Sequence, residues 1–193
     1  MRDRKNIKCV IIGDSGIGKT SLLVTYTTKV FPGNGVPKLL EFSKADLTAA
    51  NQEYALQLWD TTWEQGYTRL CSLWYPETDV FLLCFSINSW DSLDRVEERW
   101  VPEIVHMCPG VAWVLVGLKK DLRDDLDAVR DLKARKMGPV KYGDGANLAK
   151  ILGCTYVECS SRDGEGVDEV FEEALGAALL PRKQAKKSRC QIL

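Results

Sequence analysis

The chain has 193 residues, 45% of them hydrophobic and 27% charged, a composition typical of one globular domain large enough to bury a core. Because it has no apolar run of membrane-spanning length and its first residues lack the apolar stretch of a signal peptide, we expect an intracellular protein. The net charge of −1 divides into −6 over residues 1–180 and five cations without an acid in the last thirteen residues, an arrangement that argues against nucleic-acid binding.

The first predicted element is a buried strand over residues 8–12, which runs directly into a loop over 13–20 with the pattern G-x-x-x-x-G-K-T. Glycines let such a loop curl so that several backbone N–H groups point at one anion. Lys19 adds a positive charge for the β- and γ-phosphates, and the hydroxyl of Thr20 can ligate Mg²⁺. A helical pattern follows over 22–27. The motif has the flanking elements it requires and predicts a phosphate-binding site.

Strand-like and helix-like segments alternate along the rest of the chain. An extended stretch at 41–47 and a strand at 55–59 are separated by a turn at 50–52, so we expect an antiparallel hairpin. Further strands are predicted at 80–86, 112–116 and 155–159, and helices at 65–73, 89–106, 145–152 and 167–179. The alternation predicts an α/β domain whose mostly parallel sheet is covered by helices on both faces. Ligands of such sheets bind beyond the carboxyl ends of the strands, where the loop at 13–20 lies.

The segment 121–140 departs from this alternation because it is charged throughout. It carries only a thin apolar stripe, made of Leu126, Val129 and Leu132. We expect a short solvated helix inserted on the surface. Its composition alone leaves open whether it has a function or only elaborates a loop.

Several stretches taken together resemble the Rho family of small GTPases along the whole chain. Besides the phosphate loop, they are Leu58-Trp59-Asp60-Thr61, Tyr75-Pro76-Glu77-Thr78-Asp79-Val80, Cys84-Phe85-Ser86, Val116-Gly117-Leu118-Lys119-Lys120-Asp121-Leu122-Arg123 and Glu158-Cys159-Ser160. The resemblance implies a three-layer P-loop G domain over residues 1–180, with a six-stranded sheet and a Rho-type insert helix at about 121–140. It also implies a signalling switch of the cytoskeleton and polarity type, which binds GTP or GDP with Mg²⁺.

The resemblance assigns roles to individual side chains. Asp60 would support Mg²⁺ through a water beside Thr20, and Asp121 would accept two hydrogen bonds from the guanine edge. Lys119 would pack along the base plane, an aromatic residue would lie against the base, and the loop after the last strand would contact the base oxygen. The predicted nucleotide-binding residues are Gly13, Asp14, Ser15, Gly16, Ile17, Gly18, Lys19, Thr20, Ser21, Phe31, Asp60, Lys119, Asp121, Ser160, Ser161 and Arg162.

Four positions depart from the residues that relatives use for hydrolysis and switching. Ser15 replaces a glycine, and its side chain crowds the γ-phosphate and the arginine finger of an activator. Glu64 aligns with the catalytic glutamine, but an ionised carboxylate is repelled by phosphate and cannot donate a hydrogen bond. A shift of the alignment by one residue would instead place Gln65 at this position. Trp63 replaces a flexible glycine. Lys38 replaces a threonine that ligates Mg²⁺, which a cation cannot do, although it can pair with a phosphate directly.

Three further departures affect binding. Leu118 stands where the N-K-x-D motif has asparagine, and a lost buried polar contact of ~1–3 kcal/mol lowers affinity roughly tenfold to a hundredfold. Gly35 and Ser43 replace tyrosines of the effector loop. We therefore expect weakened base recognition and altered effectors.

The last four residues, from Cys190 to Leu193, match a prenylation box whose final leucine favours geranylgeranyl on Cys190. One lipid and the basic residues before it are two weak membrane signals that together give stable anchoring. The tail at 181–193 therefore predicts the cytoplasmic face of membranes, the plasma membrane in particular, with a cytosolic pool. The family implies exchange factors, GTPase-activating proteins and dissociation inhibitors as partners.

Three hypotheses remain open at this stage. The protein is a slow GTPase that cycles between two states, a nucleotide-bound switch with impaired hydrolysis that recruits partners at a membrane, or a nucleotide-free scaffold. The second is favoured, because the residues for phosphate and base binding are largely kept while those for hydrolysis are replaced.

Overall fold

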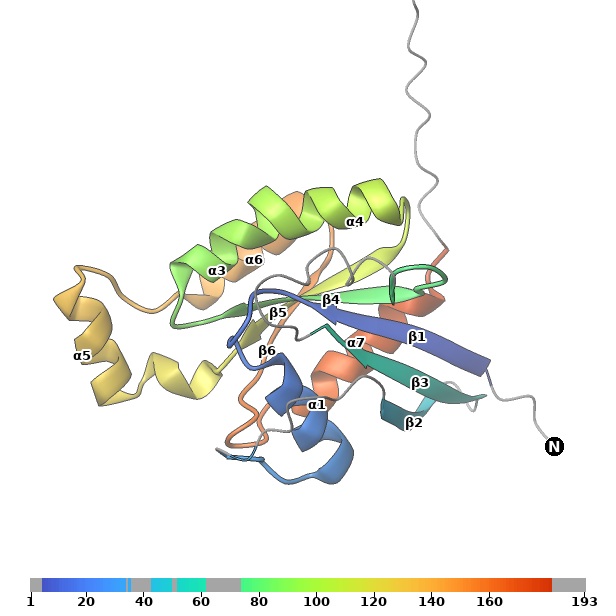
Figure 1. The fold of residues 1–193 in the computed structure, drawn as a ribbon, viewed down its shortest axis with the longest axis horizontal. Coiled ribbons are helices and arrows are strands. Elements are labelled where there is room, and N and C mark those ends of the chain that lie inside the picture. The colour runs from blue at the N-terminus through green and yellow to red at the C-terminus, as the bar shows by residue number, and fades with distance from the viewer. Residues whose placement is uncertain (1–4, 34, 36–42, 50–51, 62–73, 182–193) are drawn as a thin grey trace, which may run out of the picture.

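A computed structural model describes residues 5–33, 35, 43–49, 52–61 and 74–181. These residues contain one six-stranded sheet with the strand order β2-β3-β1-β4-β5-β6, shown in Figure 1. The strands are β1 (Lys5–Ile12), β2 (Ser43–Ala49), β3 (Gln52–Asp60), β4 (Val80–Ser86), β5 (Ala112–Leu118) and β6 (Thr155–Glu158). Every neighbouring pair is parallel except β2 with β3, which is antiparallel. The predicted six-stranded, mostly parallel sheet and its hairpin are confirmed.

Burial along the strands follows their place in the sheet. Every residue of β4 is buried, because this strand lies inside the sheet between two helical layers and needs apolar side chains on both faces. The edge strand β2 instead alternates between half-buried and exposed residues. It starts at Ser43 within the described residues, whereas the predicted segment started at 41, outside them.

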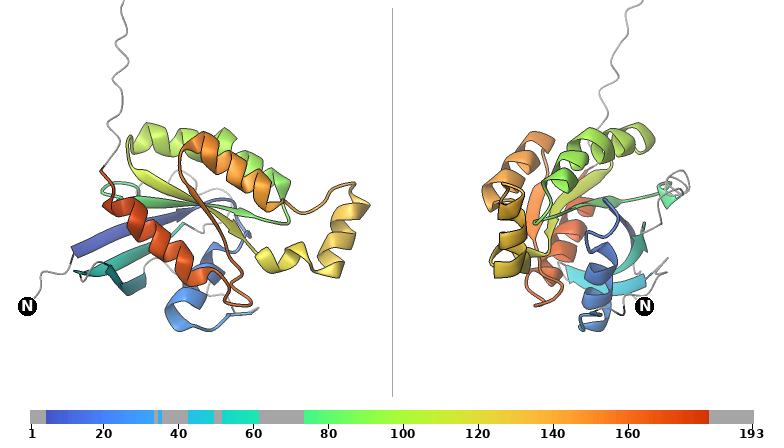
Figure 2. Two further views of the ribbon diagram at one scale, coloured as in Figure 1. Left: turned by 180° about the vertical axis from the view of Figure 1, so that it is seen from behind. Right: turned by 60° about the vertical axis from the view of Figure 1, so that its left-hand side comes forward.

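Helices cover both faces of the sheet, which confirms the predicted three layers (Figure 1 and Figure 2). Helices α1 (Lys19–Thr28) and α7 (Val167–Leu179) cover one face, and the rings of Tyr26 and Phe171 stack between them with centroids 3.8 Å apart. The other face is covered by α3 (Trp90–Arg95), η2 (Val96–Trp100), α4 (Val101–Met107) and α6 (Tyr142–Leu152). In the described part of the chain, no helix is both long and apolar enough to span a membrane.

The helix predicted at 89–106 is present but contains one wide turn. Its middle part, η2, is a π-helix in which the N–H of Val101 donates to the carbonyl of Val96, five residues back. Pro102 follows at the start of α4 and has no N–H to donate into an α-helical ladder. We attribute the change of hydrogen-bond register to this proline, because a π turn lets the helix continue through it.

The charged segment forms a short 3₁₀ turn, η3 (Lys120–Arg123), followed by helix α5 (Leu126–Ala134), which projects beyond the sheet in Figure 1. The N–H of Ala128 donates to the Asp125 carboxylate and caps α5 at 2.9 Å. A surface helix is thus confirmed; within its apolar stripe Leu132 is buried, whereas Leu126 is 80% exposed. The helix predicted at 65–73 lies outside the described residues.

Candidate functional site

The phosphate loop joins the carboxyl end of β1 to the start of α1. Gly13 has φ 145°, and a Cβ atom there would lie 2.3 Å from the carbonyl oxygen of Cys84, so only glycine fits. Gly18 forms the N-cap of α1 with φ 112° and offers no side chain to the first-turn N–H groups. Backbone N–H groups at the start of a helix attract anions, so this turn can hold a phosphate.

Lys19 lies almost completely inside this loop, with only 3% of its surface exposed. Its Nζ donates to the carbonyl oxygens of Gly13 at 2.8 Å and Asp14 at 2.7 Å. The ammonium group is therefore held at the loop by neutral acceptors. A phosphate is a stronger, charged acceptor for the same group.

Thr20 and Asp60 meet beside the loop. The Thr20 hydroxyl donates to the Asp60 carboxylate at 2.5 Å, and both residues are buried. Thr61 ties the end of β3 to β1, because its hydroxyl donates to the carbonyl of Ile11 at 2.6 Å. A hydroxyl and a carboxylate oxygen at one point suit Mg²⁺, which prefers hard oxygen ligands and keeps several waters. The residues present therefore fit this ion.

Lys119 connects the phosphate loop to the predicted base site. It follows β5 with a positive φ of 59°, and its Nζ donates to the carbonyl of Gly16 at 2.9 Å. A Cβ atom at Gly18 would lie only 3.4 Å from Cε of Lys119, so the lysine chain packs on the loop. Burial lowers the pKa of Lys119, and the charge of Asp121 opposes this shift. The lysine chain thus forms an apolar wall beside Asp121.

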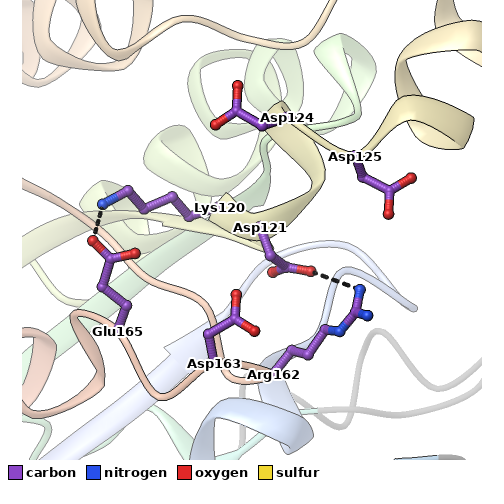
Figure 3. A pocket seen from close by; sticks show the side chains of 7 residues that line it. All are labelled: Lys120, Asp121, Asp124, Asp125, Arg162, Asp163 and Glu165. Carbon is purple, nitrogen blue, oxygen red and sulfur yellow. Dashed lines mark hydrogen bonds and ion pairs between the residues drawn. The ribbon is translucent and has the colours of Figure 1, made fainter.

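Asp121 is held by the loop after β6. The hydroxyl of Ser160, which is completely buried, donates to Oδ1 of Asp121 at 2.8 Å. The guanidinium of Arg162 lies 4.0 Å from Oδ2 (Figure 3). The N–H of Asp163 donates to the Ser160 hydroxyl at 3.1 Å and keeps it in place. The carboxylate of Asp121 is thus oriented by its neighbours and can accept hydrogen bonds from a ligand.

An open hollow of about 360 Å³ lies next to Asp121 (Figure 3). Its lining contains five carboxylates and two cations, from Lys120, Asp121, Asp124, Asp125, Arg162, Asp163 and Glu165. Lys120 and Glu165 form an ion pair at 2.5 Å across it. The hollow lies beside the predicted base-binding residue Asp121, and its acidic lining favours a ligand group that donates hydrogen bonds.

The structure places the other predicted residues around these two centres. Ser15 and Gly16 are exposed at the tip of the phosphate loop, whereas Ile17 is buried under it and Ser21 is half-buried in the first turn of α1. The carbonyl of Ser161 accepts a hydrogen bond from Thr25 at 3.2 Å, and Phe31 is 41% exposed after α1. Of these residues, Ser161 is therefore tied to α1 through Thr25, whereas Phe31 lies on the surface.

Leu118 is buried in the apolar core at the end of β5, with only 1% of its surface exposed. Gly35 closes a turn by donating its N–H to the carbonyl of Pro32 at 3.0 Å, and Ser43 pairs with Leu58 at the start of β2. The other predicted departures and the lipidation site lie outside the described residues: Lys38, Trp63, Glu64, Gln65 and Cys190.

Two side-chain networks near the site were not predicted. Asp14 accepts hydrogen bonds from Arg95 at 2.7 Å and Trp100 at 3.2 Å. Arg123 forms two hydrogen bonds of 2.6 Å with Glu158, next to the loop after β6. The second had a usable signal, because Glu158 interrupts an apolar strand and a buried acid needs a cation.

Comparison with known proteins identifies the family of the chain. A model of the Ras family matches residues 8–179. The match begins in β1 and ends at the last residue of α7, so it includes both the phosphate loop and the loop after β6 at 160–162.

Proposed function

Because the chain belongs to the Ras family of small GTPases, which are GTP-binding switches, we propose that it is a Rho-like switch that retains guanine nucleotide but hydrolyses GTP weakly. One observation carries the binding half of this proposal. Lys119 donates to the phosphate loop at Gly16 and packs on Gly18, while Asp121, two residues later, is oriented by Ser160. A single ligand can therefore reach both ends, with phosphates on the loop and a base beside Asp121.

The orientation of Asp121 supports guanine as the base. An ionised carboxylate only accepts hydrogen bonds, and the Watson–Crick edge of guanine presents two neighbouring N–H donors. Adenine presents an acceptor nitrogen at the matching position, which a carboxylate repels. Lys119 would cover the base plane in this arrangement, since its chain already lies along Gly18 of the phosphate loop.

Thr20 and Asp60 are the residues that would hold Mg²⁺, the Thr20 hydroxyl directly and the Asp60 carboxylate through water. When bound, the ion neutralises charge on the β- and γ-phosphates. Lys19 complements it from inside the loop, because its buried ammonium lies against the carbonyls of Gly13 and Asp14.

Weak hydrolysis is inferred from the chemistry of four side chains. Ser15 lies at the exposed tip of the phosphate loop, where its hydroxymethyl group occupies space next to a γ-phosphate. Glu64 carries a negative charge that repels the phosphates and cannot orient water as an amide does. Trp63 stands where Rho proteins have a flexible glycine, and Lys38 stands where they have a metal-ligating threonine.

The Rho-like and membrane parts of the proposal depend on α5 and the tail. Helix α5 lies within the segment where Rho proteins carry their insert helix. Cys190 begins a C-terminal prenylation box preceded by basic residues, so a geranylgeranyl group and the charges would together anchor the protein to the cytoplasmic face of the plasma membrane, with a cytosolic pool. As partners we propose exchange factors, dissociation inhibitors and altered effectors.

The deciding experiment is to denature the purified protein and identify the released nucleotide by chromatography. GTP supports the proposal. GDP favours an ordinary cycling GTPase and contradicts the weak hydrolysis, and no nucleotide favours a scaffold and overturns the binding half.

Two variants test the remaining parts. Single-turnover GTP hydrolysis is expected to accelerate in the variant Ser15→Gly, Trp63→Gly, Glu64→Gln, and wild-type hydrolysis as fast as in ordinary small GTPases would refute the impaired site. Cys190→Ser is expected to move the protein from the membrane fraction to the cytosol. Its persistence at the membrane would remove prenylation as the anchor.

A further inference from the structure

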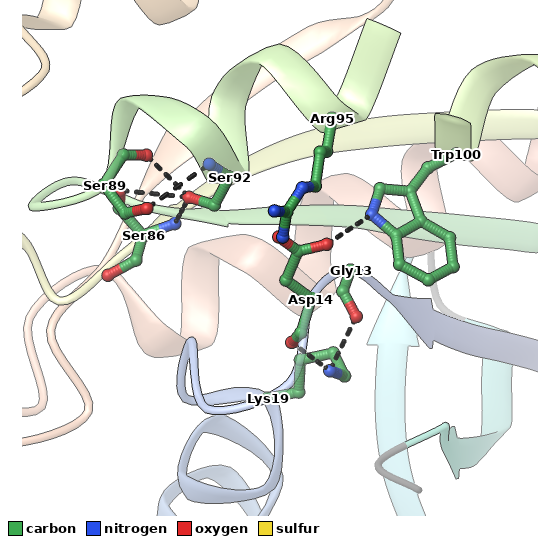
Figure 4. Close-up of polar contacts among 8 residues, drawn as sticks. All are labelled: Gly13, Asp14, Lys19, Ser86, Ser89, Ser92, Arg95 and Trp100. Carbon is green, nitrogen blue, oxygen red and sulfur yellow. Dashed lines mark hydrogen bonds and ion pairs between the residues drawn. The ribbon is translucent and has the colours of Figure 1, made fainter. Parts of the chain in front are cut away.

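Asp14 lies within the phosphate loop, yet its carboxylate points toward α3 and η2 (Figure 4). Oδ2 accepts a hydrogen bond from Nη1 of Arg95 at 2.7 Å, and Oδ1 accepts one from the indole N–H of Trp100 at 3.2 Å. Only 11% of the Asp14 side chain is exposed, against 53% for Arg95. Both carboxylate oxygens are therefore engaged by the same helical segment.

A carboxylate at this position is an electrostatic problem for a phosphate loop. Its negative charge lies next to the backbone N–H groups that attract an anion, and two negative charges repel each other. The guanidinium of Arg95 neutralises the carboxylate, and the two hydrogen bonds hold it away from the anion side. The main-chain carbonyl of Asp14 also accepts a hydrogen bond from the Lys19 ammonium at 2.7 Å. Asp14 is thus bound through its side chain to Arg95 and Trp100 and through its main chain to Lys19.

The π-helical turn explains how one helical segment supplies both partners. Residues five apart in a regular α-helix point about 140° apart, so Arg95 and Trp100 would not face one acceptor. Hydrogen bonds to the fifth residue back widen the turn and bring the two side chains to the same side. The start of α3 is held on β4, because the N–H of Ser86 donates to the Ser92 hydroxyl at 2.9 Å. The segment therefore presents both donors from a fixed position.

We propose that Arg95 and Trp100 are positioning residues for nucleotide binding, which hold the Asp14 carboxylate away from the phosphates and so keep the loop and Lys19 in the binding arrangement. This inference rests on the proposed binding of guanine nucleotide. It makes the rate of nucleotide release depend on the contact between the helical segment α3–η2 and the phosphate loop.

The test measures release of a fluorescent GDP analogue from the full-length protein in the presence of Mg²⁺. Arg95→Gln is expected to raise the release rate about tenfold, because a charge-assisted hydrogen bond is lost. Trp100→Phe keeps the ring but removes the N–H donor, and a smaller increase is expected. Arg95→Lys keeps the charge and should restore much of the wild-type rate. Arg130→Gln is the matched control, since Arg130 is 77% exposed on α5 and pairs only with Asp127 among the described residues.

A double-mutant cycle separates positioning from simple stabilisation of the fold. In an Asp14→Asn background there is no negative charge to hold, so adding Arg95→Gln should change the release rate less than twofold. An equal effect of Arg95→Gln in both backgrounds, or a rate matching that of Arg130→Gln, overturns the inference while the proposed function stands. A wild-type protein that carries and binds no guanine nucleotide overturns both.

Discussion

Thr20 and Asp60 are 40 positions apart, yet the Thr20 hydroxyl donates to the Asp60 carboxylate across 2.5 Å. The contact joins the first turn of α1 to the carboxyl end of β3, and β1, the strand that leads into α1, is the direct neighbour of β3 in the sheet. A hydroxyl that donates its proton still has lone pairs to offer to a cation. The pair is therefore arranged for a metal that Thr20 touches and Asp60 supports.

Thr20→Ala is expected to weaken the dependence of nucleotide retention on Mg²⁺. In the wild type, chelation with EDTA should accelerate GDP release strongly, because the ion ties the phosphates to Thr20. The variant should release GDP quickly with or without EDTA. Thr27→Ala serves as control, because Thr27 is exposed on the same helix and its hydroxyl donates to carbonyls of α1. A Thr20→Ala protein with the full EDTA response would contradict this site.

Asp121→Asn is expected to lower the preference for guanine over adenine nucleotides at least tenfold. The amide offers one acceptor where the carboxylate offers two, and it presents N–H donors to the donors of guanine. Competition of GTP and ATP against a fluorescent GDP analogue measures the preference. Asp124 lines the same hollow, and Asp124→Asn should leave the preference for guanine unchanged. If both variants behave alike, Asp121 does not select the base.

Leu118→Asn is expected to lower the stability of the nucleotide-free protein and, at the same time, to slow nucleotide release. An amide at this position replaces a leucine that is 1% exposed in the core, so the nucleotide-free protein should lose about 1–3 kcal/mol of unfolding free energy. If the amide reaches the base or the phosphate loop, release of bound GDP slows. Leu118→Met keeps an apolar side chain and should alter neither quantity strongly. Unchanged release in Leu118→Asn would show that this position does not contact the nucleotide.

The pair of Arg123 and Glu158 is expected to make stability depend on pH in the acid range. Burial raises the pKa of Glu158, but hydrogen bonds from Arg123 and Tyr156 outweigh it and hold the pKa below its usual value. A depressed pKa stabilises the fold above the unfolded value of about 4.3, and this stabilisation is lost as pH falls through the folded value.

Glu158→Gln should therefore cost about 3 kcal/mol at pH 7, since it leaves the partly buried Arg123 without its counter-charge. The difference from wild type in urea unfolding should stay constant down to about pH 5 and shrink below about pH 4.3. Glu165→Gln is the control, because its ion pair with Lys120 is 63% exposed on the acid side and contributes less than about 1 kcal/mol. A constant difference down to pH 3.5 would exclude the proposed linkage.

Among the described residues, the strands and helices that local patterns predict agree with the structure. The loop at 13–20, the hairpin of β2 and β3, and the alternation of strands and helices follow from residue spacing and turn residues, which act over a few positions. The order of the strands was not predicted, because it depends on contacts between distant segments. Leu126 shows the limit of such patterns, because it belongs to the apolar stripe of its segment and is nevertheless 80% exposed.

The contacts around Asp14 show what spacing could not predict. Arg95 and Trp100 lie more than 80 positions from Asp14, and they face it together only because η2 has a wide turn. A regular helix over 89–106, as the periodicity predicted, would direct them apart. The sequence contains Pro102 as a cause of irregularity, but not the direction in which the helix accommodates it.

The sequence by itself predicted a phosphate loop and an α/β domain with a mostly parallel sheet, because residue spacing and turn residues specify these, and its resemblance to small GTPases implied the residues for guanine and Mg²⁺. Only the tertiary structure decided that Asp60 meets Thr20, that Ser160 orients Asp121, and that Arg95 turns Asp14 away from the loop. These contacts join segments far apart in the chain. They depend on how strands align and helices pack, which is set by burial over the whole domain.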